Sequence, residues 1–173
     1  MNQTKGYVSF VLHAHLPFIH HPESENYLEE QWLFEAISET YIPLLINFKK
    51  LEEEKVDFRI TMSMTPPLLS MLDNKLLQKR YIKYLKTHIE LCKKELVRTA
   101  YDERLNKLSQ YYLDRFTEDL RIFKDVYNCN LIKDRLLLHL WLQSHPQQLI
   151  HSFPCLNHDQ QYMVQIQFPL SRI

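Results

Sequence analysis

The sequence predicts an α/β fold in which a strand–helix–strand unit is followed by a pair of long amphipathic helices. Residues 7–12 form a short apolar run of strand-favouring side chains, and residues 57–63 alternate in a way that suits a second strand. Between these runs, apolar side chains recur with helical spacing from Leu33 to Leu51. Strand, helix and strand over about 55 residues predict a right-handed crossover that joins two parallel strands.

Proline and capping residues set the expected ends of the helices. Pro43 lies within the first helical pattern, and we expect it to kink or divide that helix because proline lacks an amide hydrogen. Thr65 stands before Pro66 and Pro67, which predicts an N-cap followed by proline in the first turn of a short helix. Asp73 is the expected cap of the helix that follows.

Two long helical patterns come next, over residues 75–99 and 101–127. Each pattern has one apolar stripe, with charged side chains on the opposite face of the predicted helix. Helices of similar length joined by a short connection favour an antiparallel pair.

Composition excludes several classes of function. Lys and Arg total 21 and Asp and Glu total 21, so no basic excess favours nucleic acid or a membrane surface. No apolar stretch approaches the roughly 20 residues that cross a bilayer. The first residues lack a secretory signal, and three cysteines cannot form a complete disulfide framework. We therefore expect a cytoplasmic protein without a nucleic-acid or membrane partner.

The character of the chain changes near residue 134. Residues 135–173 contain no lysine and one acidic residue, Asp159, and their helical periodicity stops. Only one glycine, Gly6, occurs in the whole sequence, as expected if the chain is very helical or lacks the loop-rich part of its domain. We interpret residues 1–134 as the domain proper and residues 135–173 as a divergent tail, either native or produced by a frameshift.

The residues with the clearest chemical potential are His13 and His15, where the first strand is expected to end. Residues two apart on a strand share a face, so the two imidazoles should point the same way. They could donate hydrogen bonds to substrate hydroxyls, or they could bind a metal in a metal-dependent hydrolase barrel. The metal hypothesis needs further ligands, and His20 and His21 in the next loop do not complete such a set.

Three blocks of sequence resemble one known family. Residues 6–18, which contain His-Ala-His-Leu-Pro, are similar to the start of glycoside hydrolase family 57, in the branch of α-1,4-glucan branching enzymes. Residues 28–45 and 56–66 continue the resemblance. It implies a (β/α)7 barrel with the helical pair as a long insertion, α-glucans as substrates, a retaining double displacement, and neither a metal nor an organic cofactor.

The resemblance also assigns roles to residues. It implies that His13 and His15 line the subsite that holds the sugar at the cleavage point. Trp32 is a candidate for stacking on a sugar face, although its place beside a helical stripe also suits the core. Glu35 is a candidate for orienting the two histidines by accepting a hydrogen bond. The two catalytic carboxylates belong to later motifs of the family, so no residue of this chain is assigned to them.

A complete eight-stranded barrel needs roughly 250 residues. We therefore expect the chain to be a truncated, N-terminal part of such a barrel, without glucan-cleaving activity of its own. A non-catalytic carbohydrate-binding remnant remains a second interpretation.

Overall fold

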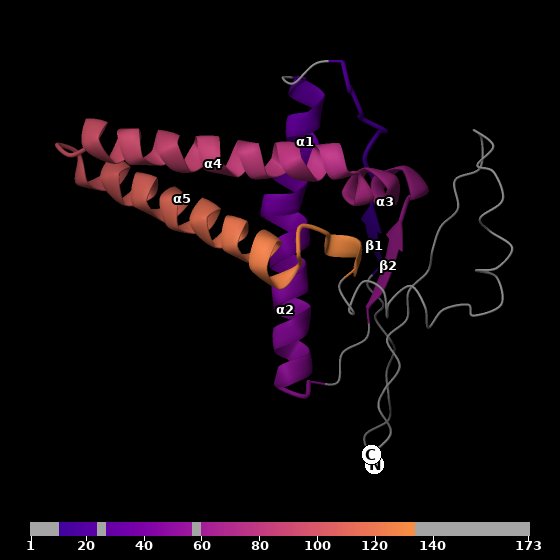
Figure 1. Ribbon diagram of the computed structural model, residues 1–173. Coiled ribbons are helices and arrows are strands. Elements are labelled where there is room, and N and C mark those ends of the chain that lie inside the picture. The colour runs from indigo at the N-terminus through magenta and orange to yellow at the C-terminus, as the bar shows by residue number, and fades with distance from the viewer. Residues whose placement is uncertain (1–10, 24–26, 57–59, 134–173) are drawn as a thin grey trace, which may run out of the picture.

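A two-stranded sheet, a long helical rod and a helical hairpin lie side by side (Figure 1). The computed structural model describes residues 11–23, 27–56 and 60–133. Its strands are β1 (Val11–Ala14) and β2 (Thr61–Met64). Its helices are α1 (Leu28–Ala36), η1 (Ile37–Tyr41), α2 (Ile42–Glu53), α3 (Pro66–Asp73), α4 (Lys75–Arg98), α5 (Glu103–Arg121), η2 (Ile122–Val126) and η3 (Leu131–Lys133).

The strands β1 and β2 are parallel, which confirms the predicted strand–helix–strand unit. Their register pairs His13 with Ser63 and Ala14 with Met64. Strand β1 extends two residues beyond the expected end at Leu12, because β2 continues to Met64 and keeps a pairing partner beside it. Residues 7–10 and 57–59 of the expected strands lie outside the described residues.

The connection between the strands is one continuous rod that consists of α1, η1 and α2 (Figure 1). Segment η1 is π-helical, and the Ile42 N–H donates to the Ile37 carbonyl oxygen. Pro43 stands immediately after this wide turn, within the first turn of α2. A proline can neither donate the helical hydrogen bond nor fit against the carbonyl four residues earlier. The helix is therefore not divided at Pro43; a π-helical turn precedes the proline within one continuous rod.

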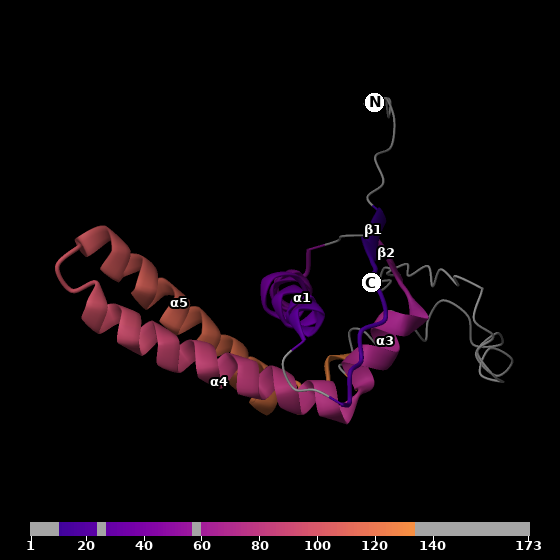
Figure 2. The same ribbon diagram turned by 90° about the horizontal axis from the view of Figure 1, so that it is seen from above.

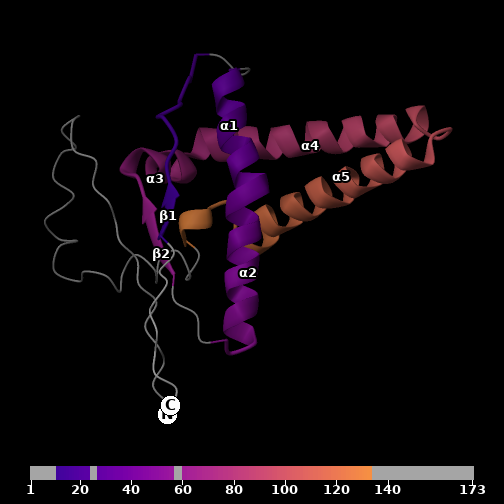
Figure 3. The same cartoon turned by 180° about the vertical axis from the view of Figure 1, so that it is seen from behind.

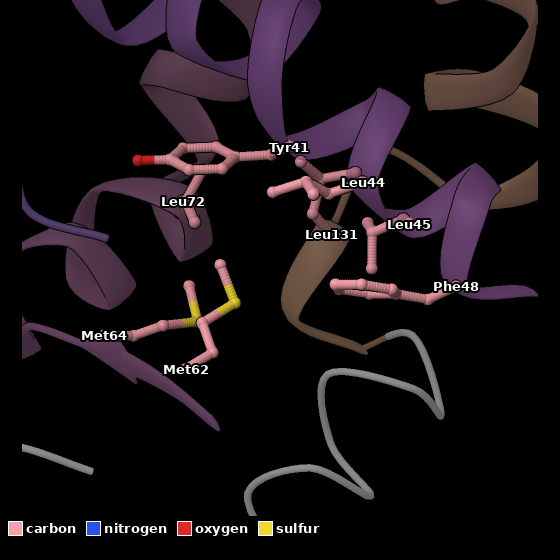
Figure 4. A pocket seen from close by; sticks show the side chains of 8 residues that line it. All are labelled: Tyr41, Leu44, Leu45, Phe48, Met62, Met64, Leu72 and Leu131. Atoms are coloured by element: carbon pink, nitrogen blue, oxygen red, sulfur yellow. The ribbon is translucent and has the colours of Figure 1, made fainter. Parts of the chain in front are cut away.

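One face of the sheet packs against this rod. Met62 and Met64 project from β2 toward α2, and a small apolar recess lies between them (Figure 4). The recess is lined by Tyr41, Leu44, Leu45, Phe48, Met62, Met64, Leu72 and Leu131. A sugar site needs polar groups that converge on hydroxyls, so we interpret the recess as a packing gap of the core.

Helices α4 and α5 form the predicted antiparallel pair. Seen from above, the rod lies between the strands and this pair (Figure 2), and the view from behind shows the same order (Figure 3). The far end of the pair projects away from the sheet, and Val97 and Tyr101 there are each 80% exposed. Among the described residues, no helix is long and apolar enough to cross a membrane.

The caps differ in part from those predicted. Asn74, not Asp73, caps α4, because its Oδ1 accepts from the backbone N–H groups of Leu76 and Leu77. Asp73 instead accepts a hydrogen bond from Asn130 Nδ2 at 2.7 Å. Thr65 is the N-cap of α3 and prolines follow in its first turn, as predicted, but among the described residues the buried Thr65 hydroxyl has no hydrogen-bond partner.

A buried polar cluster joins the rod to the helical pair. Tyr81 of α4 is fully buried, and its hydroxyl shares a hydrogen bond of 2.8 Å with Ser38 of η1. Arg115 of α5 donates to the Ser38 carbonyl oxygen. Asp119, one turn further along α5, is 5% exposed, and its Oδ2 has no hydrogen-bond partner in the part of the chain that the structure describes. Burial raises the pKa of Asp119 from 3.8 to about 6, against the lowering effect of Arg115.

We predict that Asp119→Asn stabilises the protein at neutral pH. A carboxyl whose pKa is raised by folding favours the folded state least when it is ionised, so the wild type loses stability as the pH rises from about 4 to about 6. The free energy of unfolding of the variant at pH 7 should therefore exceed that of the wild type by about 2 kcal/mol. This gap should close as the pH falls to 4, as measured by urea unfolding at each pH.

Glu118→Gln is the matched control on the neighbouring position. The hydrogen bond from Arg121 lowers the pKa of the exposed Glu118, so this variant should be slightly less stable at neutral pH, with a difference that disappears in acid. A gap for Asp119→Asn that stays constant with pH would contradict the prediction.

Candidate functional site

His13 and His15 lie at the carboxyl end of β1 and face the same way. His13 is the third residue of the strand, and His15 follows its last residue. The two imidazole rings are stacked, with centroids 5.7 Å apart and planes inclined by 14°. Both side chains are exposed. The expectation that the pair shares one face is confirmed.

Ser63 fixes the orientation of His13. It lies opposite His13 in the parallel register, and its Oγ is 2.5 Å from His13 Nδ1. Ser63 is 4% exposed, so the ring of His13 makes its hydrogen bond to a buried hydroxyl. Because Nδ1 is engaged in this contact, Nε2 is the nitrogen of His13 that is free to meet a ligand. Sequence reasoning did not select Ser63, although the register of two parallel strands could have identified it.

The segment that follows the histidines is attached to the helices beyond the sheet. The backbone N–H of Ile19, which is buried, donates to Met71 Sδ of α3 at 3.0 Å. Asn74 Nδ2 donates to His20 Nε2 at 3.4 Å. The segment is therefore attached to α3 through Ile19 and to the residue that caps α4 through His20.

A buried ion pair lies at that far end. Arg80 of α4 and Glu30 of α1 are 8% and 2% exposed, and Arg80 Nη1 contacts Glu30 Oε1. The same Nη1 donates to the carbonyl oxygen of His21 at 2.9 Å, and the N–H of His21 donates to Glu30 Oε1 at 3.4 Å. The sequence pattern does not reveal this pair, because charged residues on a helical pattern ordinarily face solvent.

Trp32 and Glu35 lie on α1, outside this hydrogen-bond system. Trp32 is 47% exposed, so the suggestion that it belongs to the core is wrong. Glu35 is exposed, and together with burial, the larger effect, it raises the pKa of Tyr84. Within the described ranges, Glu35 makes no hydrogen bond to His13 or His15. The substrate-binding roles of Trp32 and Glu35 stay predictions.

The described residues contain no group of three or more His, Cys, Asp or Glu side chains placed to hold a metal ion. What they do present at the edge of the sheet is a pair of stacked imidazoles and a buried hydroxyl. Such a set can exchange hydrogen bonds with a polyhydroxylated ligand.

Comparison with known proteins identifies the family. The sequence model of glycosyl hydrolase family 57 matches residues 9–164, which is most of the chain. The chain belongs to glycosyl hydrolase family 57. The match includes the sheet, the rod and the helical pair, and it continues into the segment beyond residue 134. The division into a domain of residues 1–134 and a divergent tail of residues 135–173 stays a prediction.

Several members of family 57 resemble this chain. A 1,4-alpha-glucan branching enzyme of Thermococcus kodakarensis is 38% identical over 112 residues, which are 65% of this chain and 16% of that protein. The crystal structure of the alpha-amylase AmyC from Thermotoga maritima is 44% identical and matches 75% of this chain and 24% of its own, with a TM-score of 0.68. The crystal structure of the branching enzyme from Pyrococcus horikoshii is 32% identical. It matches 79% of this chain and 25% of its own, with a TM-score of 0.70. This chain spans at most a quarter of these relatives.

We predict that His13 and Ser63 are energetically coupled. The free energies of unfolding of His13→Ala, Ser63→Ala and the double variant should reveal a coupling of about 1 kcal/mol, the usual net contribution of one hydrogen bond. The cycle of His15→Ala with Ser63→Ala is the matched control, because His15 makes no hydrogen bond to Ser63 in the described structure. Equal coupling in the two cycles would refute the contact.

Proposed function

We propose that this chain forms part of an α-glucan-active enzyme of family 57 and that His13 and His15 bind a glucose unit of the substrate. The observation that carries the proposal is the stacked, exposed histidine pair at the carboxyl edge of two parallel strands. In α/β barrels, binding groups gather at this edge. The relatives include branching enzymes and an alpha-amylase, which supports a glucan as the ligand.

The two imidazoles suit neighbouring sugar hydroxyls. Each neutral ring has one nitrogen that donates and one that accepts, and a hydroxyl can satisfy either. Stacking fixes the two ring planes relative to each other, so their free nitrogens meet hydroxyls with a defined spacing. Trp32 offers an exposed aromatic face, and Glu35 offers an exposed carboxylate, for further contacts along the glucan.

We further propose that β1 and β2 are the first two strands of a (β/α)7 barrel and that α4 and α5 are its inserted hairpin. The TM-scores to the two crystal structures, at identities above 30%, support this assignment. The face of the sheet that carries His13 and Ser63 is opposite the face that packs on α2. In a barrel, helices cover the outer face of the strands, so the histidine face would line the interior.

The reaction itself requires residues other than those described here. A retaining glycosidase uses a carboxylate nucleophile and an acid–base carboxyl about 5 to 5.5 Å apart. In a branching enzyme, a sugar 6-hydroxyl rather than water would then capture the glycosyl-enzyme. We propose that both carboxyl groups come from the later motifs of the family, and that the 173-residue chain binds glucan without cleaving it.

We predict that His13→Ala and His15→Ala each weaken the binding of maltoheptaose about tenfold, which corresponds to one lost hydrogen bond of about 1.4 kcal/mol. Isothermal titration calorimetry of the full chain measures this affinity. Tyr101→Ala, at the far end of the helical pair, is the control, because Tyr101 is exposed but distant along the hairpin from the sheet. Undiminished affinity in both histidine variants would overturn the assignment.

The metal-dependent alternative is decided by metal analysis of the same preparations. A stoichiometric metal ion that is lost in both His13→Ala and His15→Ala would favour a metal-dependent hydrolase over a glucan-binding pair.

We also predict that the chain alone produces no turnover. Incubation with amylose should leave the absorbance of the iodine complex and the number of branch points unchanged, because the covalent route needs both carboxyl groups. An active member of the family, tested in parallel, controls for the assay. Turnover by the chain would show that it carries its own catalytic carboxylates.

A further inference from the structure

We infer that Glu30 and Arg80 are positioning residues for the histidine pair, which hold the segment of residues 16–22 in the conformation that presents His15. This inference rests on the proposed function, because it names the device that shapes the same sugar-binding edge. It concerns two side chains that are remote in sequence from His13 and His15 and that make contact with the backbone of His21.

The Glu30–Arg80 pair differs from the short-range ion pairs of the described residues. Those six pairs join partly or fully exposed side chains two to four positions apart in the sequence. Glu30 and Arg80 are 50 positions apart and buried, and they join α1 to α4. Removing two charges from water is costly, and apolar residues of similar size often serve stability equally well. Stability alone therefore does not explain why two charges are placed here.

The geometry of the pair indicates what it does. Glu30 accepts from the N–H of His21, and Arg80 donates to the carbonyl oxygen of the same residue. Both backbone groups of His21 are thereby fixed. Arg80 Nε remains buried without a hydrogen-bond partner in the described part of the chain. The guanidinium is therefore oriented to contact Glu30 and His21, although this leaves one of its own donors unpaired.

The fixed residue is close along the chain to the proposed sugar-binding edge. Five residues separate His15 from His21, and of these Ile19 and His20 are attached to Met71 and Asn74. At the other end, the contact of His13 with Ser63 holds the strand. Residues 14–18, which include His15, form the span between these attachments, and Phe18 is 61% exposed. Fixing both ends of so short a span restricts where the ring of His15 can lie.

The test replaces both charges at once with apolar residues of similar length, Glu30→Leu with Arg80→Met, in the full chain. Apolar replacement of a buried ion pair often leaves stability unchanged or raises it, so we expect a thermal midpoint no lower than that of the wild type. Amide hydrogen exchange in residues 16–22 should accelerate about tenfold, because its two anchoring side chains are gone. Affinity for maltoheptaose should fall about tenfold, since the histidine pair is no longer preorganised.

Glu118→Leu with Arg121→Met is the matched control, because it replaces an exposed ion pair in the same way. It should change neither the exchange of residues 16–22 nor the affinity. Arg80→Lys keeps the buried charge and is the test variant if the double variant does not fold. A single ammonium group cannot reproduce the planar fork of arginine, so Arg80→Lys should also accelerate exchange in residues 16–22.

Unchanged exchange in the variants that fold would overturn the inference, whatever the ligand. Faster exchange with undiminished maltoheptaose affinity would also overturn it, and the proposed function would stand. If the wild type does not bind maltoheptaose, the proposed function fails, while the exchange measurements still decide whether Glu30 and Arg80 position the segment.

Discussion

The parallel pairing of β1 with β2 is the constraint on which the rest of this structure depends. Parallel strands cannot be joined by a tight turn, so the chain must cross over, and the rod of α1, η1 and α2 is that crossover. The same pairing brings the carboxyl ends of both strands to one edge, which sets Ser63 beside His13. The two faces of the sheet then have separate tasks. Met62 and Met64 pack on α2, whereas His13 and Ser63 face away from it.

Polar groups connect the layers where apolar packing alone would not fix their relative positions. Tyr81 joins α4 to η1 through Ser38, and its ring lies edge-on to Phe123 at 4.8 Å. Glu30 and Arg80 join α1 to α4. Because apolar contacts are not directional and hydrogen bonds are, these groups select one arrangement among several that bury similar area.

The wide π-helical turns lie where the rod and the helical pair meet polar partners. Segment η1 contains Ser38, the partner of Tyr81 and Arg115, and segment η2 follows α5 directly after Asp119 and Arg121. A π-helical turn changes the angular position of the residues beyond it. In η1, it accommodates Pro43 and turns Ser38 toward the buried cluster at the same time.

The sequence alone determined the α/β class, the helices and the histidine pair, because these depend on local periodicity and on alternation along a strand. His13 and His15 share a face wherever the strand lies. Tertiary structure decided which residues act on them. Ser63 is the partner of His13 because the register of two strands 50 residues apart in the sequence places them opposite each other. Asn74, and not the expected Asp73, caps α4. The sequence pattern predicts that Glu30 and Arg80 face solvent on two helices, whereas the packing of α1 against α4 buries them together. A local pattern does not contain this contact, because it forms only when the two helices pack.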